Sequence, residues 1–291
     1  MNRFFLSVLL PVCSALMLGA ANPPVAVDLW PDGAPNDNGI LADAEAESNQ
    51  FVTSVSKPVI YVYPASEPNG TAIVMLPGGG YSGLAMYHEG TDMADWLNSM
   101  GITYAVLKYR MPNGHVDVPL SDAEQAMRIM RSHAAEWGVN PSSVGIMGAS
   151  AGGHLATTLA THYTSEETRP DFQVLFYPVV SMRDDITHQY SRAMLMGENP
   201  TAEQIDGLSN ELQVNARTPN AFIMLSADDD AVPVANSLRY FQALTDAGVL
   251  SAMHVYPSGG HGWGYRDSFP YKSDWKSELQ DWLRREVIGK K

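Results

Sequence analysis

From residue 59 onward, the chain alternates between short apolar runs and longer segments in which apolar residues recur every three or four positions. The apolar runs predict buried strands, which we place at Val59 to Tyr63, Thr71 to Leu76, Ile102 to Tyr109, Val144 to Met147, Phe172 to Tyr177, Ala221 to Ser226 and Ser251 to Tyr256. The helical spacing predicts helices, which we place at Thr91 to Met100, Ser121 to Trp137, His154 to His162, Pro233 to Gly248 and Ser273 to Ile288. Such alternation is typical of α/β folds, in which helices cover both faces of a mostly parallel twisted sheet.

Two segments depart from this alternation. Residues 22–57 are rich in Pro, Asn, Asp and Ala and predict an irregular lead-in with one short strand near Val25 to Trp30. The polar stretch 181–218 predicts a surface insertion with two short helices over the carboxyl edge of the sheet. Because neither a repeat nor a second domain is indicated, residues 22–291 are expected to form one domain. Within it, Ser121 and Glu124 form a capping-box pattern that predicts a helix start, and Gly138 predicts the end of that helix.

The first residues have the pattern of a secretory signal peptide. A positive start at Arg3 is followed by an apolar stretch from Phe4 to Leu18 and then by small residues. We therefore expect residues 1–21 to be a signal peptide and the protein to be secreted or periplasmic. A lipoprotein interpretation of Cys13 is weaker, because Val12 is larger than the residue expected before a lipidated cysteine. Since Cys13 is the only cysteine, the mature chain would have no thiol nucleophile and no disulfide.

Composition narrows the function classes. The hydrophobic content of 45% and the charged content of 17% are those of an ordinary folded globule. The formal charge of −14 disfavours nucleic acid and anionic membrane surfaces as partners. The composition carries no signal for an oligomeric state.

The chemistry is indicated first by Gly148-Ala149-Ser150-Ala151-Gly152. This G-x-S-x-G pattern lies between a predicted strand and a predicted helix, which is the context of a nucleophile elbow. Glycines two positions either side of Ser150 let the neighbouring elements close around a strained turn. The sequence therefore predicts Ser150 as a nucleophile at the N-terminus of a helix.

The triple glycine Pro77-Gly78-Gly79-Gly80-Tyr81 follows another predicted strand. Acyl transfer through a serine creates an oxyanion that needs backbone N–H donors. Gly79 and Gly80 are predicted donors, together with Ala151. A flexible turn or a phosphate-binding loop is the alternative, but a phosphate loop would carry a Lys-Ser/Thr or a longer glycine pattern.

Two further strand ends supply a carboxylate and an imidazole. Of the three consecutive acids at 228–230, Asp229 is the predicted partner of the histidine, by its spacing to Val232-Pro233. His261 lies on a glycine-flanked loop before the last helix. The order Ser, Asp, His is that of α/β-hydrolases, and the carboxyl ends of parallel strands bring such loops to one edge.

Three residues beside these loops are candidates for substrate binding, namely Tyr81, His88 and Trp263. The two aromatic rings could stack on a sugar or simply wall the pocket. The remaining histidines lack the spacing of metal ligands, so we expect neither a metal nor a cofactor.

The chain resembles the secreted bacterial esterase/lipase-like α/β-hydrolases, most of all the branch with acetylxylan esterases and other hemicellulose deacetylases. The motifs that carry the resemblance extend over nearly all of the mature chain and are Pro77-Gly78-Gly79-Gly80-Tyr81, His88-Glu89-Gly90, Leu107-Lys108-Tyr109-Arg110, Gly148 to His154, Asp228-Asp229 with Val232-Pro233, and Gly259-Gly260-His261-Gly262. The resemblance implies Ser150 as nucleophile, His261 as base, Asp229 as its orienting acid, and Gly79, Gly80 and Ala151 as oxyanion donors.

The expected activity is a serine carboxylesterase that removes short acyl groups, above all acetyl, from plant-wall polysaccharide such as xylan or its oligosaccharides. An acylated carbohydrate would be its partner. A general short-chain or feruloyl esterase is the first alternative, and a peptidase of the prolyl oligopeptidase type or a non-catalytic binding protein are others. Glycosidic cleavage is not indicated, because no pair of opposed carboxylates is placed on the predicted sheet.

Overall fold

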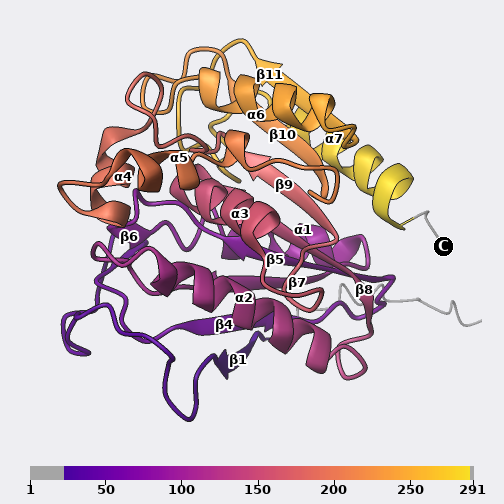
Figure 1. The fold of residues 1–291 in the computed structure, drawn as a ribbon. Helices are drawn as coiled ribbons and strands as arrows, with labels where there is room; N and C mark the ends of the chain where they lie inside the picture. The colour runs from indigo at the N-terminus through magenta and orange to yellow at the C-terminus, as the bar shows by residue number, and fades with distance from the viewer. Residues whose placement is uncertain (1–22, 289–291) are drawn as a thin grey trace, which may run out of the picture.

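The computed structural model describes residues 23–288, which build an eight-stranded twisted sheet flanked by helices (Figure 1). The strand order across the sheet is β1-β4-β7-β5-β8-β9-β10-β11. The strands are β1 (Val25–Asp28), β4 (Val59–Tyr63), β5 (Gly70–Leu76), β7 (Thr103–Lys108), β8 (Val139–Ala149), β9 (Phe172–Phe176), β10 (Asn220–Ser226) and β11 (Ser251–Tyr256). β4 runs antiparallel to both of its neighbours, and the other pairs are parallel. The predicted mostly parallel sheet is confirmed.

Helices cover both faces of the sheet, as predicted (Figure 1). The first face carries α1 (Ala94–Ser99), which follows a 3₁₀ turn at Thr91–Met93, and α7 (Lys272–Leu283), which ends in a π-helical turn at Arg284–Ile288. The ring of Trp96 from α1 meets that of Trp275 from α7 edge to face at 5.2 Å. The opposite face carries α2 (Asp117–Ser132), α3 (Ser150–His162) and α6 (Ala235–Asp246).

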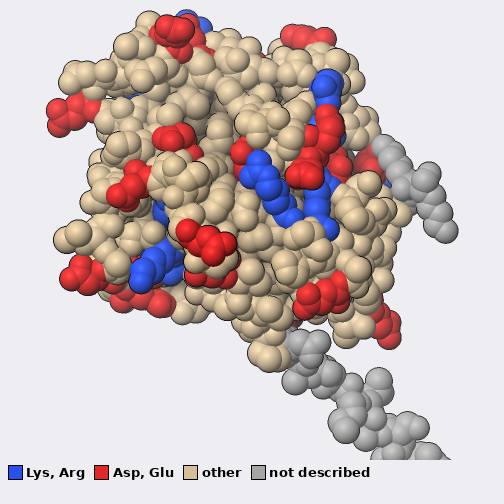
Figure 2. All heavy atoms as spheres, turned by 60° about the horizontal axis from the view of Figure 1, so that its bottom comes forward, with Lys and Arg blue, Asp and Glu red and all other residues tan. Residues whose placement is uncertain are grey.

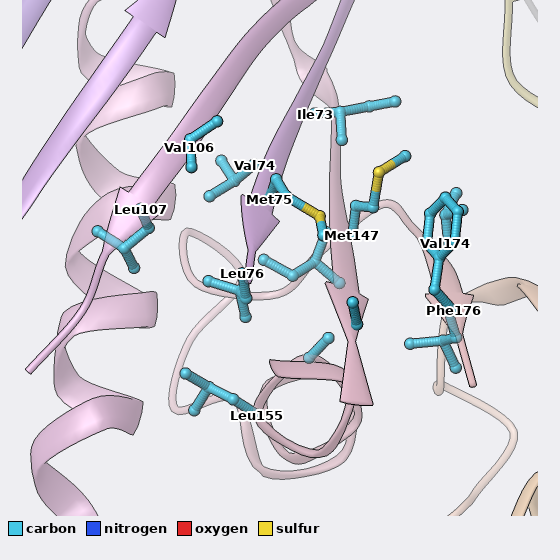
Figure 3. Close-up of a cluster of buried hydrophobic side chains, with 14 of the residues drawn as sticks. Ile73, Val74, Met75, Leu76, Val106, Leu107, Met147, Leu155, Val174 and Phe176 are labelled. Carbon is cyan, nitrogen blue, oxygen red and sulfur yellow. The ribbon is translucent and has the colours of Figure 1, made fainter. Parts of the chain in front are cut away.

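The core lies along the central strand β5. Residues 71–76 of this strand are all buried, because β7 and β8 flank it and helices cover both of its faces. Figure 3 shows Met75 beside Met147 of β8, and Leu76 facing Leu155 of α3. Burial on both faces explains why this strand appears in the sequence as a continuous apolar run.

The polar insertion contains two short helices, as predicted, α4 (Gln189–Met196) and α5 (Ala202–Gly207), and a 3₁₀ turn at Asn210–Leu212. In Figure 1 these helices lie at the same end of the molecule as β6. β6 (Gly83–Leu84) belongs to a small antiparallel sheet with β2 (Ala46–Ser48) and β3 (Phe51–Thr53). The prediction of a single strand in the lead-in was therefore incomplete.

Two predicted helix starts were wrong. α2 begins at Asp117 instead of Ser121, and it ends at Ser132 instead of Trp137. The Ser121 hydroxyl donates to the carbonyl of Val118 one turn earlier, and the first turn accommodates Pro119 because its missing N–H has no helical acceptor there. α3 begins at Ser150 instead of His154, since the strand-to-helix turn leads directly into the helix.

The predicted signal peptide at 1–21 lies outside the described residues. None of the helices formed by residues 23–288 is both long enough and apolar enough to cross a membrane. On the face drawn in Figure 2, acidic and basic side chains are interspersed, and the whole chain has 32 acidic residues against 18 lysines and arginines.

A buried ion pair joins the lead-in to the sheet and to α2. The guanidinium of Arg110 lies 2.7 Å from a carboxylate oxygen of Asp122, and both side chains are almost fully buried. Trp30 Nε1 donates to the same carboxylate at 2.8 Å, and Arg110 donates to the carbonyl of Asn36 at 2.7 Å. Each charge thus has several partners, which a buried ion pair requires.

We expect Asp122→Ala to lower the free energy of unfolding by about 3–5 kcal/mol, because it leaves the Arg110 guanidinium buried without its counter-charge. Asp281→Ala is the matched control, since it breaks a solvent-exposed pair with Arg285 and should cost less than about 1 kcal/mol. Urea denaturation of the two variants and the wild type measures both values. Equal losses would contradict this assignment.

Candidate active site

Ser150 stands at the tight turn between β8 and α3. Its backbone φ is 52°, in the left-handed region that most residues avoid. A Cβ at Gly148 would lie 2.3 Å from the carbonyl oxygen of Gly152, and a Cβ at Gly152 would lie 2.1 Å from that of Leu76. No side chain fits at either glycine, so the predicted reason for the G-x-S-x-G spacing is present in the structure.

Ser150, His261 and Asp229 are brought together at the carboxyl edge of the sheet. His261 Nε2 lies 2.8 Å from the Ser150 hydroxyl, and His261 Nδ1 lies 2.7 Å from Asp229 Oδ2. The second oxygen of Asp229 accepts the backbone N–H groups of Ala231 and Val232 at 3.0 and 2.9 Å. The carboxylate can only accept from Nδ1, so Nε2 is left free to take the proton of the serine hydroxyl.

The three consecutive acids have different positions. The side chain of Asp229 is 1% exposed, whereas Asp228 and Asp230 lie on the surface. Asp228 accepts the backbone N–H groups of Gly260 and Gly259 at 2.8 and 3.2 Å. The hydrogen bond from Gly260 is the main reason why the pKa of Asp228 is lowered. The hydrogen bonds of Asp228 therefore link the loop that carries His261 to the loop that carries Asp229.

The triple-glycine loop passes beside Ser150. A Cβ at Gly78 would lie 2.8 Å from the Cβ of Ser150. Within residues 23–288, the N–H groups of Gly79 and Gly80 donate to no protein acceptor. The N–H of Ala151 lies in the first turn of α3, where helical N–H groups have no partner within the helix. These three donors are available for an oxyanion, and their role stays a prediction.

Residues 73–264 match a family model described as the alpha/beta hydrolase fold. The chain belongs to this family.

Similar proteins include an acetylxylan esterase of Xylanibacter ruminicola, 42% identical over 75% of this chain and 46% of that protein. An endo-1,4-beta-xylanase B of Butyrivibrio fibrisolvens is 31% identical over 84% of this chain and 43% of that protein. The chain thus spans less than half the length of these two curated relatives. The crystal structure of an acetyl ester-xyloside bifunctional hydrolase from Caldicellulosiruptor lactoaceticus has a TM-score of 0.77 and 33% identity, and the match covers 93% of this chain and 98% of that one.

The two aromatic candidates for substrate binding, which were predicted to stack on a sugar or to wall the pocket, are both buried in the structure. Tyr81 is 1% exposed, because its left-handed backbone (φ 62°) turns the ring inward, where its hydroxyl meets His154 Nδ1 at 2.9 Å. Trp263 is 4% exposed, and its ring stacks on Phe269 with centroids 4.0 Å apart. Neither ring is available to stack on a sugar.

The third predicted substrate-binding residue, His88, lies behind the loop that carries His261. Arg266 donates to its ring at 3.2 Å. Burial, followed by the charge of Arg266, lowers the pKa of His88 to about 4. Contact between His88 and a substrate stays a prediction. Within the described residues, no group of three or more His, Cys, Asp or Glu side chains is arranged to hold a metal ion.

Two residues of the insertion lie close to these loops, and no sequence pattern had marked them as candidates for the site. Tyr190 of α4 is 51% exposed, and a Cβ at Gly80 would lie 2.9 Å from its ring. His188, just before α4, has its pKa lowered, first by burial and then by the nearby His261. The insertion was predicted to cover the carboxyl edge, but no periodic pattern marks which of its side chains face the site.

His154 connects three parts of the site. Its Nε2 lies 2.8 Å from the carbonyl of Leu208 in the insertion, so Nε2 carries the proton and Nδ1 accepts from Tyr81. Burial lowers the pKa of His154 to about 4. This neutral ring joins the elbow helix, the triple-glycine loop and the insertion.

We expect stability to fall as the pH drops from about 6.5 to about 4, because the unfolded histidine takes up a proton there while buried His154 does not. In His154→Gln the slope of unfolding free energy against pH should be shallower by up to about 1.4 kcal/mol per pH unit. Urea titrations at several pH values measure the slope. The exposed His115→Gln is the control variant, and an unchanged slope in His154→Gln would refute the assignment.

Proposed function

We propose that this protein is a serine carboxylesterase that removes short acyl groups, above all acetyl, from plant-wall carbohydrate such as xylan or its oligosaccharides. The observation that carries the proposal is the 2.8 Å contact between Ser150 Oγ and His261 Nε2, with Asp229 on the other ring nitrogen. The names of the relatives support the substrate class, although the chain spans less than half of the two curated ones.

The reaction begins when Ser150 Oγ attacks the ester carbonyl and His261 Nε2 takes the hydroxyl proton. Asp229 stabilises the imidazolium that forms. The N–H groups of Gly79, Gly80 and Ala151 donate to the oxyanion. As the tetrahedral intermediate collapses, His261 gives the proton to the departing sugar oxygen, and an acyl-enzyme remains. Water then attacks that ester with His261 again as base, and acetate leaves.

Ester cleavage is favoured over glycosidic cleavage. The similar protein from Caldicellulosiruptor lactoaceticus is described as a bifunctional acetyl ester-xyloside hydrolase. In this chain, however, Asp229 is engaged with His261, and the other buried carboxylate near the site, Glu89, accepts from Gly78 and Tyr177. Neither is free to act as the acid or the nucleophile of a glycosidase.

The test is acetate release from acetylated xylan, measured beside acetylated glucomannan, a feruloyl ester, an aminoacyl amide and an aryl xyloside. We expect acetylated xylan or its oligosaccharides to be cleaved fastest. Ser150→Ala should lower turnover by at least about 10⁴-fold while the fold is kept. Turnover by Ser150→Ala close to that of the wild type would refute the mechanism. Preference for another ester would refute only the substrate.

We further propose that Tyr190 provides the aromatic surface for the sugar. Its half-exposed ring lies against Gly80, beside the predicted oxyanion donors. Among the described residues, it is the only aromatic side chain in the group of large, well-exposed hydrophobics. An exposed ring at that position offers a flat apolar face to a pyranose, which neither Tyr81 nor Trp263 can do.

We expect Tyr190→Ala to raise KM for acetylated xylo-oligosaccharides by about tenfold, which corresponds to about 1.4 kcal/mol of lost ring contact. KM for ethyl acetate, which carries no sugar ring, should change by less than about twofold. Tyr190→Phe keeps the ring and should behave like the wild type. An equal rise of KM for both substrates would contradict a sugar-specific role.

We also propose that the protein acts outside the cytoplasm, in the periplasm or the medium. The signal-peptide pattern of residues 1–21 supports this location. Detection of the processed protein in periplasmic or medium fractions would test it.

A further inference from the structure

A buried carboxylate that the mechanism does not use lies directly behind the catalytic residues. Glu89 is 3% exposed. Its Oε2 accepts the backbone N–H of Gly78 at 2.9 Å, and its Oε1 accepts the hydroxyl of Tyr177 at 2.7 Å. Burial raises the pKa of Glu89, and the hydrogen bond from Tyr177 is the largest effect that opposes the rise. Burying a carboxyl group is costly unless it is hydrogen-bonded, and the hydrogen bonds of Glu89 come from two separate loops.

Glu89 reaches the oxyanion loop on one side. Gly78 immediately precedes Gly79 and Gly80, whose N–H groups are the predicted oxyanion donors. A Cβ at Gly78 would lie 2.6 Å from Glu89 Oε2, so the backbone approaches this carboxylate as closely as a glycine allows. The hydrogen bond from the Gly78 N–H fixes the position of the backbone that carries the next two N–H groups, those of Gly79 and Gly80.

On the other side Glu89 reaches the loop of His261 through Tyr177. The Tyr177 hydroxyl, while donating to Glu89, accepts the backbone N–H of Gly264 at 2.8 Å. The Tyr177 ring also packs edge to face against the His261 ring, with centroids 4.7 Å apart. Tyr177 has a left-handed backbone with φ 34°, a conformation that persists only where the surroundings impose it and that is often found at functional sites.

The turn that carries Glu89 is itself fixed. The Tyr104 hydroxyl donates to the carbonyl of Gly90 at 2.9 Å. The N–H of Tyr265, in the loop of His261, donates to the carbonyl of His88 at 2.7 Å. The turn is thus anchored to the sheet and bonded to the histidine loop a second time.

From these contacts we infer that Glu89 is a positioning residue, which holds the oxyanion loop and, through Tyr177, the His261 loop in the relative geometry that the transition state needs. This inference rests on the proposed serine esterase function. Glu89 affects the rate of the reaction step and not the binding of substrate, because it lies behind both loops.

The variants Glu89→Ala, Glu89→Gln and Tyr177→Phe separate the possible roles. In Glu89→Gln the amide oxygen can accept from Gly78 and the amide nitrogen can donate to the Tyr177 oxygen, so both contacts are kept without the charge, although the bond to Tyr177 reverses its direction. Glu89→Ala removes both links, and Tyr177→Phe removes only the hydroxyl. Glu124→Gln is the matched control, because Glu124 is also buried and accepts a backbone N–H, that of Thr164 at 3.1 Å, away from the triad.

The measurement is kcat and KM for p-nitrophenyl acetate, with the concentration of active sites titrated by a phosphonate that labels Ser150. We expect Glu89→Ala to lower kcat per active site by about 10²-fold, the lower end of the effect of losing an oxyanion donor, with KM within about twofold. Tyr177→Phe should lower kcat by about tenfold. In Glu89→Gln, kcat per active site should stay within about threefold of the wild-type value. In the double variant Glu89→Ala/Tyr177→Phe, kcat should be no lower than in Glu89→Ala, because Glu89 and Tyr177 act through one chain of hydrogen bonds.

Several results would overturn the inference. One is kcat per active site unchanged in Tyr177→Phe, which is informative even if Glu89→Ala fails to fold. Another is Glu89→Gln as slow as Glu89→Ala together with Tyr177→Phe as fast as the wild type, which would assign the role to charge instead of position. A wild type that neither reacts with the phosphonate nor hydrolyses p-nitrophenyl acetate would refute the serine esterase itself. Hydrolysis of that ester without cleavage of acetylated xylan would refute only the substrate class.

Discussion

The site depends on one constraint, the left-handed backbone of Ser150 where β8 turns into α3. A residue with a side chain tolerates this conformation only when its surroundings impose it, at a cost of about 1–3 kcal/mol. The elbow closes so tightly that neither Gly148 nor Gly152 has room for a Cβ. The same turn starts α3 at Ser150, places the N–H of Ala151 beside the hydroxyl and directs that hydroxyl toward His261. Residues 71–76 of β5 and 144–149 of β8 are buried, and their packing keeps the backbone of Ser150 in this strained conformation.

Most of the sheet could be predicted because its inner strands β5, β7, β9 and β10 are buried on both faces, so that each appears as an apolar run. The edge strand β11 is only partly buried, and it too has the predicted bounds, Ser251 to Tyr256. Predictions failed where the local pattern had two physical meanings. Ser121 precedes Glu124 as in a capping box, but a serine inside a helix can bond its own carbonyl one turn back, as it does here. The strands β2 and β3 were missed because three-residue strands that are exposed, as β2 is, or only partly buried, as β3 is, leave no apolar run.

The nucleophile, base and acid could be predicted because each follows the end of a strand, and strand ends fix the position of the backbone. Strand ends do not fix the direction in which a side chain beside such a loop points. Tyr81 follows the oxyanion loop as a pocket residue would, but its positive φ turns it into the core. Trp263 stands between two glycines of positive φ and is likewise turned inward. Tyr190, which does face outward beside Gly80, belongs to an insertion without periodic pattern.

Three residues with side chains, Tyr81, Ser150 and Tyr177, have left-handed backbones around this one edge of the sheet. Each is buried and hydrogen-bonded, Tyr81 to His154, Ser150 to His261 and Tyr177 to Glu89. Such strain would relax if the surrounding loops could move independently, so its presence argues that they move together or not at all. A catalytic geometry assembled from loops far apart in the sequence needs that coupling, and Glu89 with Tyr177 supplies it from behind the catalytic residues without touching the substrate.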